Sequence, residues 1–156
     1  MIDISKYGSD GIVHGLKVLQ ASVHILCAKV NGYRINIVGS NFYEYHAFLG
    51  LVHEKLEKSY YDTGERIKML GGMSNFSVKD MLELSVVDDE SSAVEHYDDM
   101  VKTMNQDFNN LSSLARSIFA SAGPLSDAGT IALVTGLCFN VFEHFAWETH
   151  AMMQGE

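Results

Sequence analysis

The chain has 156 residues, 47% of them hydrophobic, and contains a single proline. This length suits one domain with one core, and so little proline leaves long stretches free to form helices. The net charge of -9 disfavours duplex DNA as a partner, because DNA binding depends on positive side chains that neutralise phosphates. No apolar run reaches the roughly 20 residues of a membrane span, and no signal-peptide pattern opens the chain, so a cytoplasmic protein without a membrane segment is expected.

The first predicted helix starts at a cap formed by Ser9 or Asp10 and runs to about Val38, where Gly39 ends it. Its apolar positions alternate in steps of four and three, as one buried face of a helix requires. These positions are Ile12, Leu16, Leu19, Val23, Leu26, Val30, Tyr33 and Ile37.

The second predicted helix spans Asn41 to Gly72 and follows the first after a very short turn. Its apolar and small residues again recur every three or four positions: Phe42, Tyr45, Leu49, Val52, Leu56, Ser59 or Tyr60, Thr63, Ile67 and Leu70. The glycine pair at residues 71–72 ends it. Because the turn is so short, the two helices are expected to pack as antiparallel neighbours.

A short capped helix is predicted from Ser77 to Leu84, followed by an acidic link at residues 88–92 that starts the third long helix. The predicted buried face of that helix is Val94, Tyr97, Val101, Met104, Phe108, Leu111, Ala115 and Ile118. The pair at residues 123–124 ends it, and Asp127 caps the fourth helix, whose predicted apolar face is Ile131, Val134, Cys138, Val141, Phe145, Glu148 and Met152. These elements predict an all-α four-helix bundle with a short extra helix between the second and third long helices.

The two cysteines lie inside apolar helical patterns, Cys27 in the first helix and Cys138 in the fourth. This placement predicts buried free thiols more than a disulfide or a metal knuckle. A reducing, cytoplasmic compartment fits such thiols best.

Several short motifs resemble the Dps family of ferritin-like miniferritins. They are Gly39-Ser40-Asn41-Phe42, His46, Glu65-Arg66-Ile67, Leu70-Gly71-Gly72, and the stretches at residues 127–130 and 143–147, and the likeness extends from about residue 9 to residue 152. The resemblance implies one ferritin-like domain over residues 1–156 with a short N-terminal arm at residues 1–8. It also implies a two-fold dimer that assembles into a dodecameric shell, takes up ferrous iron, oxidises it with peroxide and stores it.

In Dps-like proteins a ferroxidase site is shared by two subunits, and the resemblance places its five ligand positions at Arg34, His46, Gly50, Tyr61 and Glu65. Only His46 and Glu65 keep the family's ligands; Tyr61 can bind ferric iron only as a phenolate. A guanidinium has no lone pair for a metal, and glycine has no side chain. If the family dimer forms, Arg34 should approach the partner's Glu65, so we predict a degenerate site with an ion pair in place of iron. No Glu-x-x-His motif occurs, which argues against a di-iron centre inside one bundle.

His53 and Glu57 share one helical stripe with His46 and Gly50. One interpretation is a replacement iron site that joins His46, His53 and Glu57 to Glu65 across the interface. The other is a solvated polar face with a hydrogen-bonded histidine, which the pattern favours.

His144 and Glu148 are four residues apart, and they either hold a metal or form a surface pair. Glu148 also falls on the predicted apolar face, where a buried carboxylate needs a partner. Asp127 stands near the start of the fourth helix, where the acidic residues of Dps-like shells line a three-fold pore. A single carboxylate there predicts only weak attraction for cations.

Three functions are compatible with these observations. The first is a miniferritin that oxidises and stores iron and protects against oxidative stress, with a degenerate ferroxidase site. The second is a non-catalytic Dps-like shell or scaffold without iron chemistry, which the substituted ligand positions favour. The third, a DNA-compacting protein, is the weakest, because Lys6 is the one basic residue of the N-terminal arm and residues 152–156 carry none.

Overall fold

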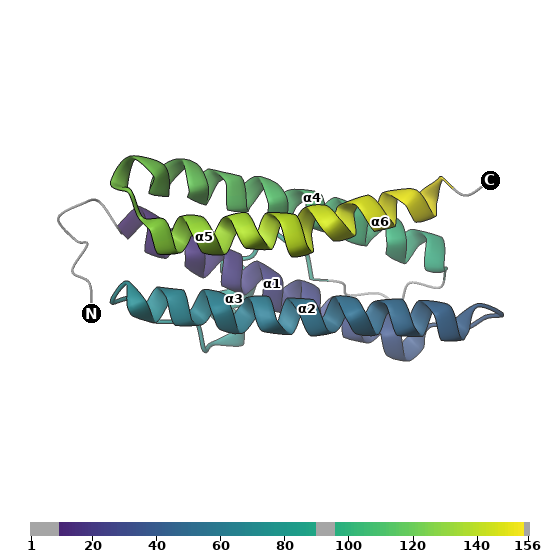
Figure 1. Cartoon of the computed structure of the whole chain (residues 1–156). Helices are drawn as coiled ribbons and strands as arrows, with labels where there is room; N and C mark the ends of the chain where they lie inside the picture. The colour runs from purple at the N-terminus through teal and green to yellow at the C-terminus, as the bar shows by residue number, and fades with distance from the viewer. Residues whose placement is uncertain (1–9, 90–95, 155–156) are drawn as a thin grey trace.

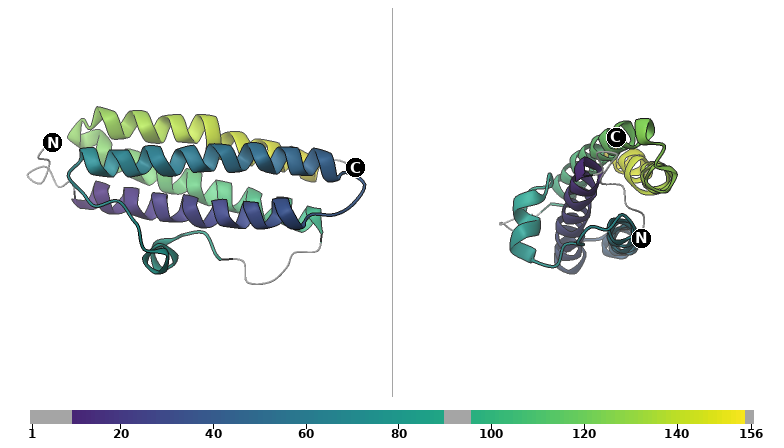
Figure 2. Two further views of the ribbon diagram at one scale, coloured as in Figure 1. Left: turned by 90° about the horizontal axis from the view of Figure 1, so that it is seen from below. Right: turned by 90° about the vertical axis from the view of Figure 1, so that its left-hand side faces the viewer.

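In the computed structural model, which describes residues 10–89 and 96–154, the chain forms helices and turns and no strand within those ranges. Four rods lie along one another in Figure 1: α1 (Asp10–Asn36), α2 (Phe42–Met69), α4 (Tyr97–Ala122), and a last rod that contains α5 (Ala128–Leu137) and α6 (Glu143–Met153). The short helix α3 (Val78–Leu84) packs on the outside of α1, as Figure 2 shows. The predicted all-α four-helix bundle with one extra helix is therefore confirmed.

The buried face of α1 is the one that its sequence pattern predicts. All the predicted apolar positions between Ile12 and Ile37 are at most 4% exposed. The helix ends at Asn36, slightly before the predicted Val38. Gly39 adopts a φ of +128°, a conformation that side chains beyond glycine rarely reach, and this lets the chain reverse into α2.

The C-terminal end of α2 is closed by its glycine pair, as predicted. Gly71 has a φ of +85° and donates its N–H to the carbonyl oxygen of Lys68 at 3.0 Å. The N–H of Gly72 reaches back to the carbonyl oxygen of Ile67 at 2.9 Å. These two bonds form a Schellman motif, which satisfies carbonyl groups that the end of a helix leaves unpaired.

The connection between α2 and α4 is held to α1 by hydrogen bonds. The side chain of Gln20, which is 1% exposed, accepts from the backbone N–H of Asn75 at 3.0 Å and donates to the Ser74 hydroxyl at 2.8 Å. Further along, the Ser22 hydroxyl accepts from the N–H of Val86 at 2.9 Å. The intervening α3 starts at the predicted cap, Ser77, and these bonds fix its position on the bundle.

The third long helix begins later than predicted. The acidic stretch at residues 88–92 was expected to start it, but the described residues 88–89 are not helical, and α4 begins at Tyr97 after an N-cap at His96. The aspartates at positions 98 and 99 provide the negative charge that the first turn of a helix favours. Val94, which was assigned to the buried face, lies outside the described residues.

The last rod departs from the predicted apolar face, and it is not a continuous α-helix. Residues Cys138–Phe142 form a π-helical turn, whose wider path lets both Val141 and Phe142 face the core. Thr130, Leu137 and Thr149 are buried in place of the predicted Ile131, Cys138 and Glu148, and Met152 is 41% exposed. A face drawn with ideal α-helical spacing misses such a turn, so the prediction that Glu148 is buried is wrong.

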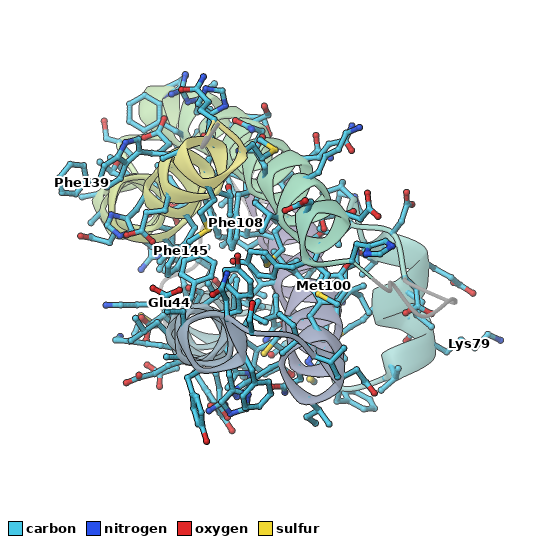
Figure 3. All side chains as sticks on the ribbon, turned by 90° about the vertical axis from the view of Figure 1, so that its right-hand side faces the viewer. Glu44, Lys79, Met100, Phe108, Phe139 and Phe145 are labelled. Atoms are coloured by element: carbon cyan, nitrogen blue, oxygen red, sulfur yellow. The ribbon has the colours of Figure 1, made fainter. Side chains whose placement is uncertain are left out.

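Aromatic side chains fill the middle of the bundle. The rings of Phe108 and Phe145 lie 5.3 Å apart, and Figure 3 shows them between the rods. Phe139, in the π-helical turn, points away from the core and is 76% exposed. The core therefore continues across the irregular turn, while one aromatic ring of the turn is left on the surface.

Two helical stretches, Gly11–Asn36 and Ala128–Met153, are long and apolar enough to span a membrane by length and composition alone. Within the bundle, 50% of the most apolar part of the first stretch and 33% of that of the second are buried. Core helices of soluble proteins are often as long and as apolar, so this is weak evidence for a membrane span.

A single domain over residues 1–156 stays a prediction, and the N-terminal arm at residues 1–8 lies outside the described residues.

Candidate functional site

Arg34, near the end of α1, lies directly over Gly50 in α2. A Cβ atom built on Gly50 would lie 3.1 Å from Nη2 and 3.2 Å from Cζ of Arg34. The Nδ1 atom of His46 lies 2.9 Å from the carbonyl oxygen of Arg34, which can only accept a hydrogen bond. In the neutral imidazole, Nδ1 therefore carries the proton and Nε2 keeps its lone pair. Three of the five positions implied by the family resemblance thus meet within one chain.

The guanidinium of Arg34 has an unused hydrogen-bonding group. Its Nε atom is buried and finds no acceptor among the residues that the structure describes. A buried donor without a partner costs free energy. A fixed positive charge that seeks an acceptor does not fit a cation at the same place.

The other two positions, Tyr61 and Glu65, lie elsewhere on α2. At about 1.5 Å per residue they are about 16 and 22 Å along the helix from Gly50, too far to share an ion with it. Tyr61 is 62% exposed, and together with Glu65 it lines a shallow hollow beside Ser74 and Met69. The five positions can meet only between two copies of the chain.

His53 and Glu57 form a separate group with Cys27 of α1. The Sγ atom of Cys27 lies 3.2 Å from Nδ1 of His53, and Nε2 of His53 lies 3.7 Å from the Glu57 carboxylate. His53 follows His46 by two turns of α2, about 10.5 Å, so the two imidazoles cannot bind one ion within a chain. Within residues 10–89 and 96–154, no group of three or more His, Cys, Asp or Glu side chains is placed to hold a metal ion.

Asp127 caps α5 and is engaged within its own chain. Its Oδ1 atom accepts from the backbone N–H of Thr130 at 3.1 Å and from Nη2 of Arg66 at 2.5 Å. Burial raises the pKa of Asp127, but the hydrogen bonds from Thr130 and the charge of Arg66 outweigh it and hold the pKa below its ordinary value. The carboxylate is therefore largely neutralised by Arg66, which weakens any attraction for cations in a pore.

We expect the substitution D127A to lower the free energy of unfolding by about 0.5–2 kcal/mol at neutral pH, the usual effect of losing an N-cap. D127N keeps the cap but removes the charge that faces Arg66, so its loss should be smaller. Because the folded pKa of Asp127 is lowered, its contribution is present above the unfolded pKa and is lost as the pH falls through the folded value. Urea titrations at neutral and acid pH should show the difference between wild type and D127N closing in acid; a constant difference would contradict the role of the charge.

His144 and Glu148, which the sequence predicts as a pair, lie on the surface of α6. Nε2 of His144 and Oε1 of Glu148 are 3.3 Å apart, and their side chains are 44% and 32% exposed.

Cys138 is half-buried, and burial raises the pKa of its thiol. Both cysteines are free thiols, as the sequence predicts, although neither is fully buried.

Two features have no counterpart in the sequence-based predictions. Lys29 and Asp107 form an ion pair of 2.9 Å whose side chains are 3% and 9% exposed. The contact between Cys27 and His53 joins α1 to α2. In the sequence, each of these residues is visible only as a polar or sulfur-containing side chain one position from an apolar face. That position does not identify a partner on another helix.

No protein-family model matches the chain. Among curated proteins, it is 26% identical over 147 residues to an uncharacterized low temperature-induced protein of Nostoc sp., covering 94% of this chain and 82% of the relative. It is also 26% identical over 116 residues to the DNA protection during starvation protein of Helicobacter pylori, covering 74% of this chain and 81% of that protein.

The fold is that of known ferritin-like structures. The Dps protein from Vibrio cholerae O1, described as a member of a broad superfamily of ferritin-like diiron-carboxylate proteins, superimposes with a TM-score of 0.88 at 23% identity. The match covers 94% of this chain and 91% of that one. The prediction of a ferritin-like bundle is thereby confirmed.

Proposed function

Because the chain belongs to the Dps family of ferritin-like proteins, we propose that it is a self-assembling shell protein whose inter-subunit ferroxidase site is replaced by an ion pair. The observation that carries this proposal is the position of the Arg34 guanidinium over Gly50. It fills the space that a carboxylate ligand at position 50 would need. Iron, the substrate of the family's reaction, would meet a permanent positive charge there.

One antiparallel pairing of two α2 helices would bring all five positions together. If His46 faces the partner's Glu65, the same register places Gly50 opposite the partner's Tyr61. The two-fold axis then passes between residues 55 and 56. In that register the partner's Glu65 would offer a carboxylate to the guanidinium that lies over Gly50.

Exposed apolar side chains around this face favour self-association. They occur on α2 and in the connection that carries α3: Tyr43 at 85%, Tyr61 at 62%, Met69 at 53%, Met73 at 60%, Phe76 at 84% and Val78 at 58% exposure. Apolar patches of this kind on a soluble domain mark interfaces more often than free surface. We propose assembly through this face into the twelve-subunit shell that the family implies, in a reducing compartment such as the cytoplasm, which suits two free thiols.

DNA is not proposed as a ligand, although relatives carry DNA in their names. The net charge of -9 opposes phosphate binding. The alternative function is a working miniferritin with altered ligands at His46, His53, Glu57 and Glu65. His46 favours this alternative, because its Nε2 lone pair is available.

Ferrous iron followed by peroxide distinguishes the two functions. We expect the purified chain, loaded without oxygen, to give ferric product no faster than buffer alone, with the product precipitating rather than eluting with the protein. Iron should also leave the melting temperature unchanged, because a ligand that does not bind the native state cannot stabilise it. Soluble ferric product that forms faster than in buffer would overturn the proposal and support the altered site.

A further inference from the structure

One side chain from each of α2, α4 and α6 meets at the end of the bundle where α4 begins. The rings of Tyr45 and Tyr97 are stacked, with centroids 3.3 Å apart and an angle of 8° between their planes. The hydroxyl of Tyr97 donates a hydrogen bond to Sδ of Met152 at 3.4 Å. Tyr97 is the first residue of α4 and Met152 lies in the last turn of α6, so this cluster connects two helix ends. The proposed shell function does not use these residues.

The thioether of Met152 is open to small oxidants. Met152 is 41% exposed, whereas Met100 and Met104 inside the bundle are at most 2% exposed. Peroxide converts an accessible methionine to its sulfoxide, a polar side chain that reductases return to methionine. Met153, the next residue, is 43% exposed, but its sulfur accepts no hydrogen bond from any residue that the structure describes. The two neighbours are therefore equally accessible and differ in their contact with Tyr97.

The hydroxyl of Tyr97 is a donor that is held in place beside the sulfur. Burial raises the pKa of Tyr97, and the neighbouring Tyr45, Asp98 and Glu44 act in the same direction, so the hydroxyl keeps its proton at physiological pH. The stack on Tyr45 orients the ring. A thioether sulfur is only a weak acceptor, so the hydroxyl of Tyr97 has a weak partner in Met152.

We propose that Met152 is a site of oxidation by hydrogen peroxide, and that the Tyr97 hydroxyl then binds the sulfoxide oxygen and ties the end of α6 to the start of α4. The sulfur lone pair attacks one oxygen of the peroxide, the O–O bond breaks, and that oxygen stays on the sulfur. The sulfur is oxidised by two electrons, and the departing hydroxide takes the proton of the transferred hydroxyl and leaves as water. Rotation of the flexible, exposed side chain brings the new oxygen to the hydroxyl of Tyr97.

Oxidation strengthens this contact because it changes the acceptor. The sulfoxide oxygen is a strong acceptor, whereas the thioether sulfur is a weak one. A sulfoxide formed inside a core disrupts packing, but Met152 lies at the surface, where the new oxygen stays in contact with water. The last turn of a helix opens easily, because its carbonyl groups lack partners within the helix. An added bond at this position should therefore slow the opening of the end of α6.

This proposal depends on neither iron nor assembly. The three side chains belong to one chain, and hydrogen peroxide is the one external reactant. Failure of the shell proposal would leave this one unaffected, and the reverse also holds.

Hydrogen–deuterium exchange of the full-length protein, before and after peroxide treatment, tests the proposal, and peptide mass spectrometry locates each added oxygen. M153L leaves Met152 as the one methionine of α6, and M152L leaves Met153. We expect peroxide to oxidise the remaining methionine in both variants. The amides of residues 149–153 should then exchange about 2–10-fold more slowly in oxidised M153L, the factor that one hydrogen bond contributes, and at an unchanged rate in oxidised M152L. Treatment is stopped while the buried methionines remain unmodified, so that the bundle stays folded.

Two tyrosine substitutions in the M153L chain isolate the hydroxyl of Tyr97. Y97F keeps the ring that stacks on Tyr45 but removes the donor, so Met152 should still be oxidised while exchange does not slow. Y45F is the matched control, which keeps the donor and should respond as M153L does. Methionine sulfoxide reductases should return oxidised M153L to its initial exchange rate. A Met152 that peroxide does not oxidise, exchange that is unchanged or faster after oxidation of M153L, or equal slowing in the Y97F chain would overturn the proposal.

Discussion

The triple variant R34H/G50D/Y61D is expected to oxidise ferrous iron with peroxide and to keep the ferric product in solution, which the wild-type chain should not do. The substitutions remove the guanidinium that lies over Gly50 and restore an imidazole and two carboxylates around His46 and Glu65. We expect the rate to exceed that of wild type by more than about tenfold, since even indirect partners of metal ligands change affinity by roughly 10–100-fold. Stopped-flow absorbance of the ferric product measures the rate.

Two comparisons show whether the restored site is shared between subunits. G50D alone should remain inactive, because the new carboxylate pairs with the guanidinium of Arg34, which would lie within about 3.1 Å of its Cβ. Co-assembly of R34H/G50D chains with Y61D chains should restore part of the activity, because one site of each mixed dimer is then complete. Equal activity in R34H/G50D chains alone and in the mixture would contradict the antiparallel pairing of α2.

The substitution D107A is expected to lower the free energy of unfolding by about 3–5 kcal/mol, because it leaves the ammonium of Lys29 buried without its partner. The Lys29 and Asp107 side chains are 3% and 9% exposed, and their charged atoms are 2.9 Å apart. Guanidinium or urea denaturation followed by circular dichroism measures the loss. A loss within about 0.5 kcal/mol would show that water reaches Lys29 in the absence of Asp107.

The double variant K29M/D107L provides the control for this experiment. Replacing both charges with apolar side chains should recover most of the stability, because a buried ion pair costs about as much in desolvation as it returns in attraction. The pair of Lys58 and Asp62 is a matched surface control, since its side chains are 71% and 38% exposed at a separation of 2.6 Å. D62A should cost no more than about 1 kcal/mol.

The fold could be predicted from the sequence because the apolar spacing of its helices is regular. On α1 every predicted position between Ile12 and Ile37 is buried, and both glycine breaks end helices as expected. The last rod was predicted less well, since nothing in its sequence marks the π-helical turn at Cys138–Phe142. A single wider turn moves the buried face by one residue, and the prediction then selects Glu148 where Thr149 is buried.

The polar contacts of the candidate sites were predictable only in part. The family resemblance identified positions 34, 46 and 50, and the structure places Arg34 against Gly50 and His46. The partners of Cys27 and Lys29 were not predicted, because each lies on a different helix from its partner and helical spacing carries no information about pairing between helices. Such contacts depend on how far each rod is rotated about its own axis.

The π-helical turn lets the last rod hold one residue more than a straight α-helix would between its two buried threonines. From Thr130 to Thr149 an ideal α-helix would make about 5.3 turns, which would carry the second threonine away from the core, yet both are buried. The wide turn absorbs one residue and restores the alignment of α5 with α6. The chain can therefore carry one residue more than a straight rod needs, at a point where Phe139 is already turned to the surface, while both flanking helices keep their packing faces.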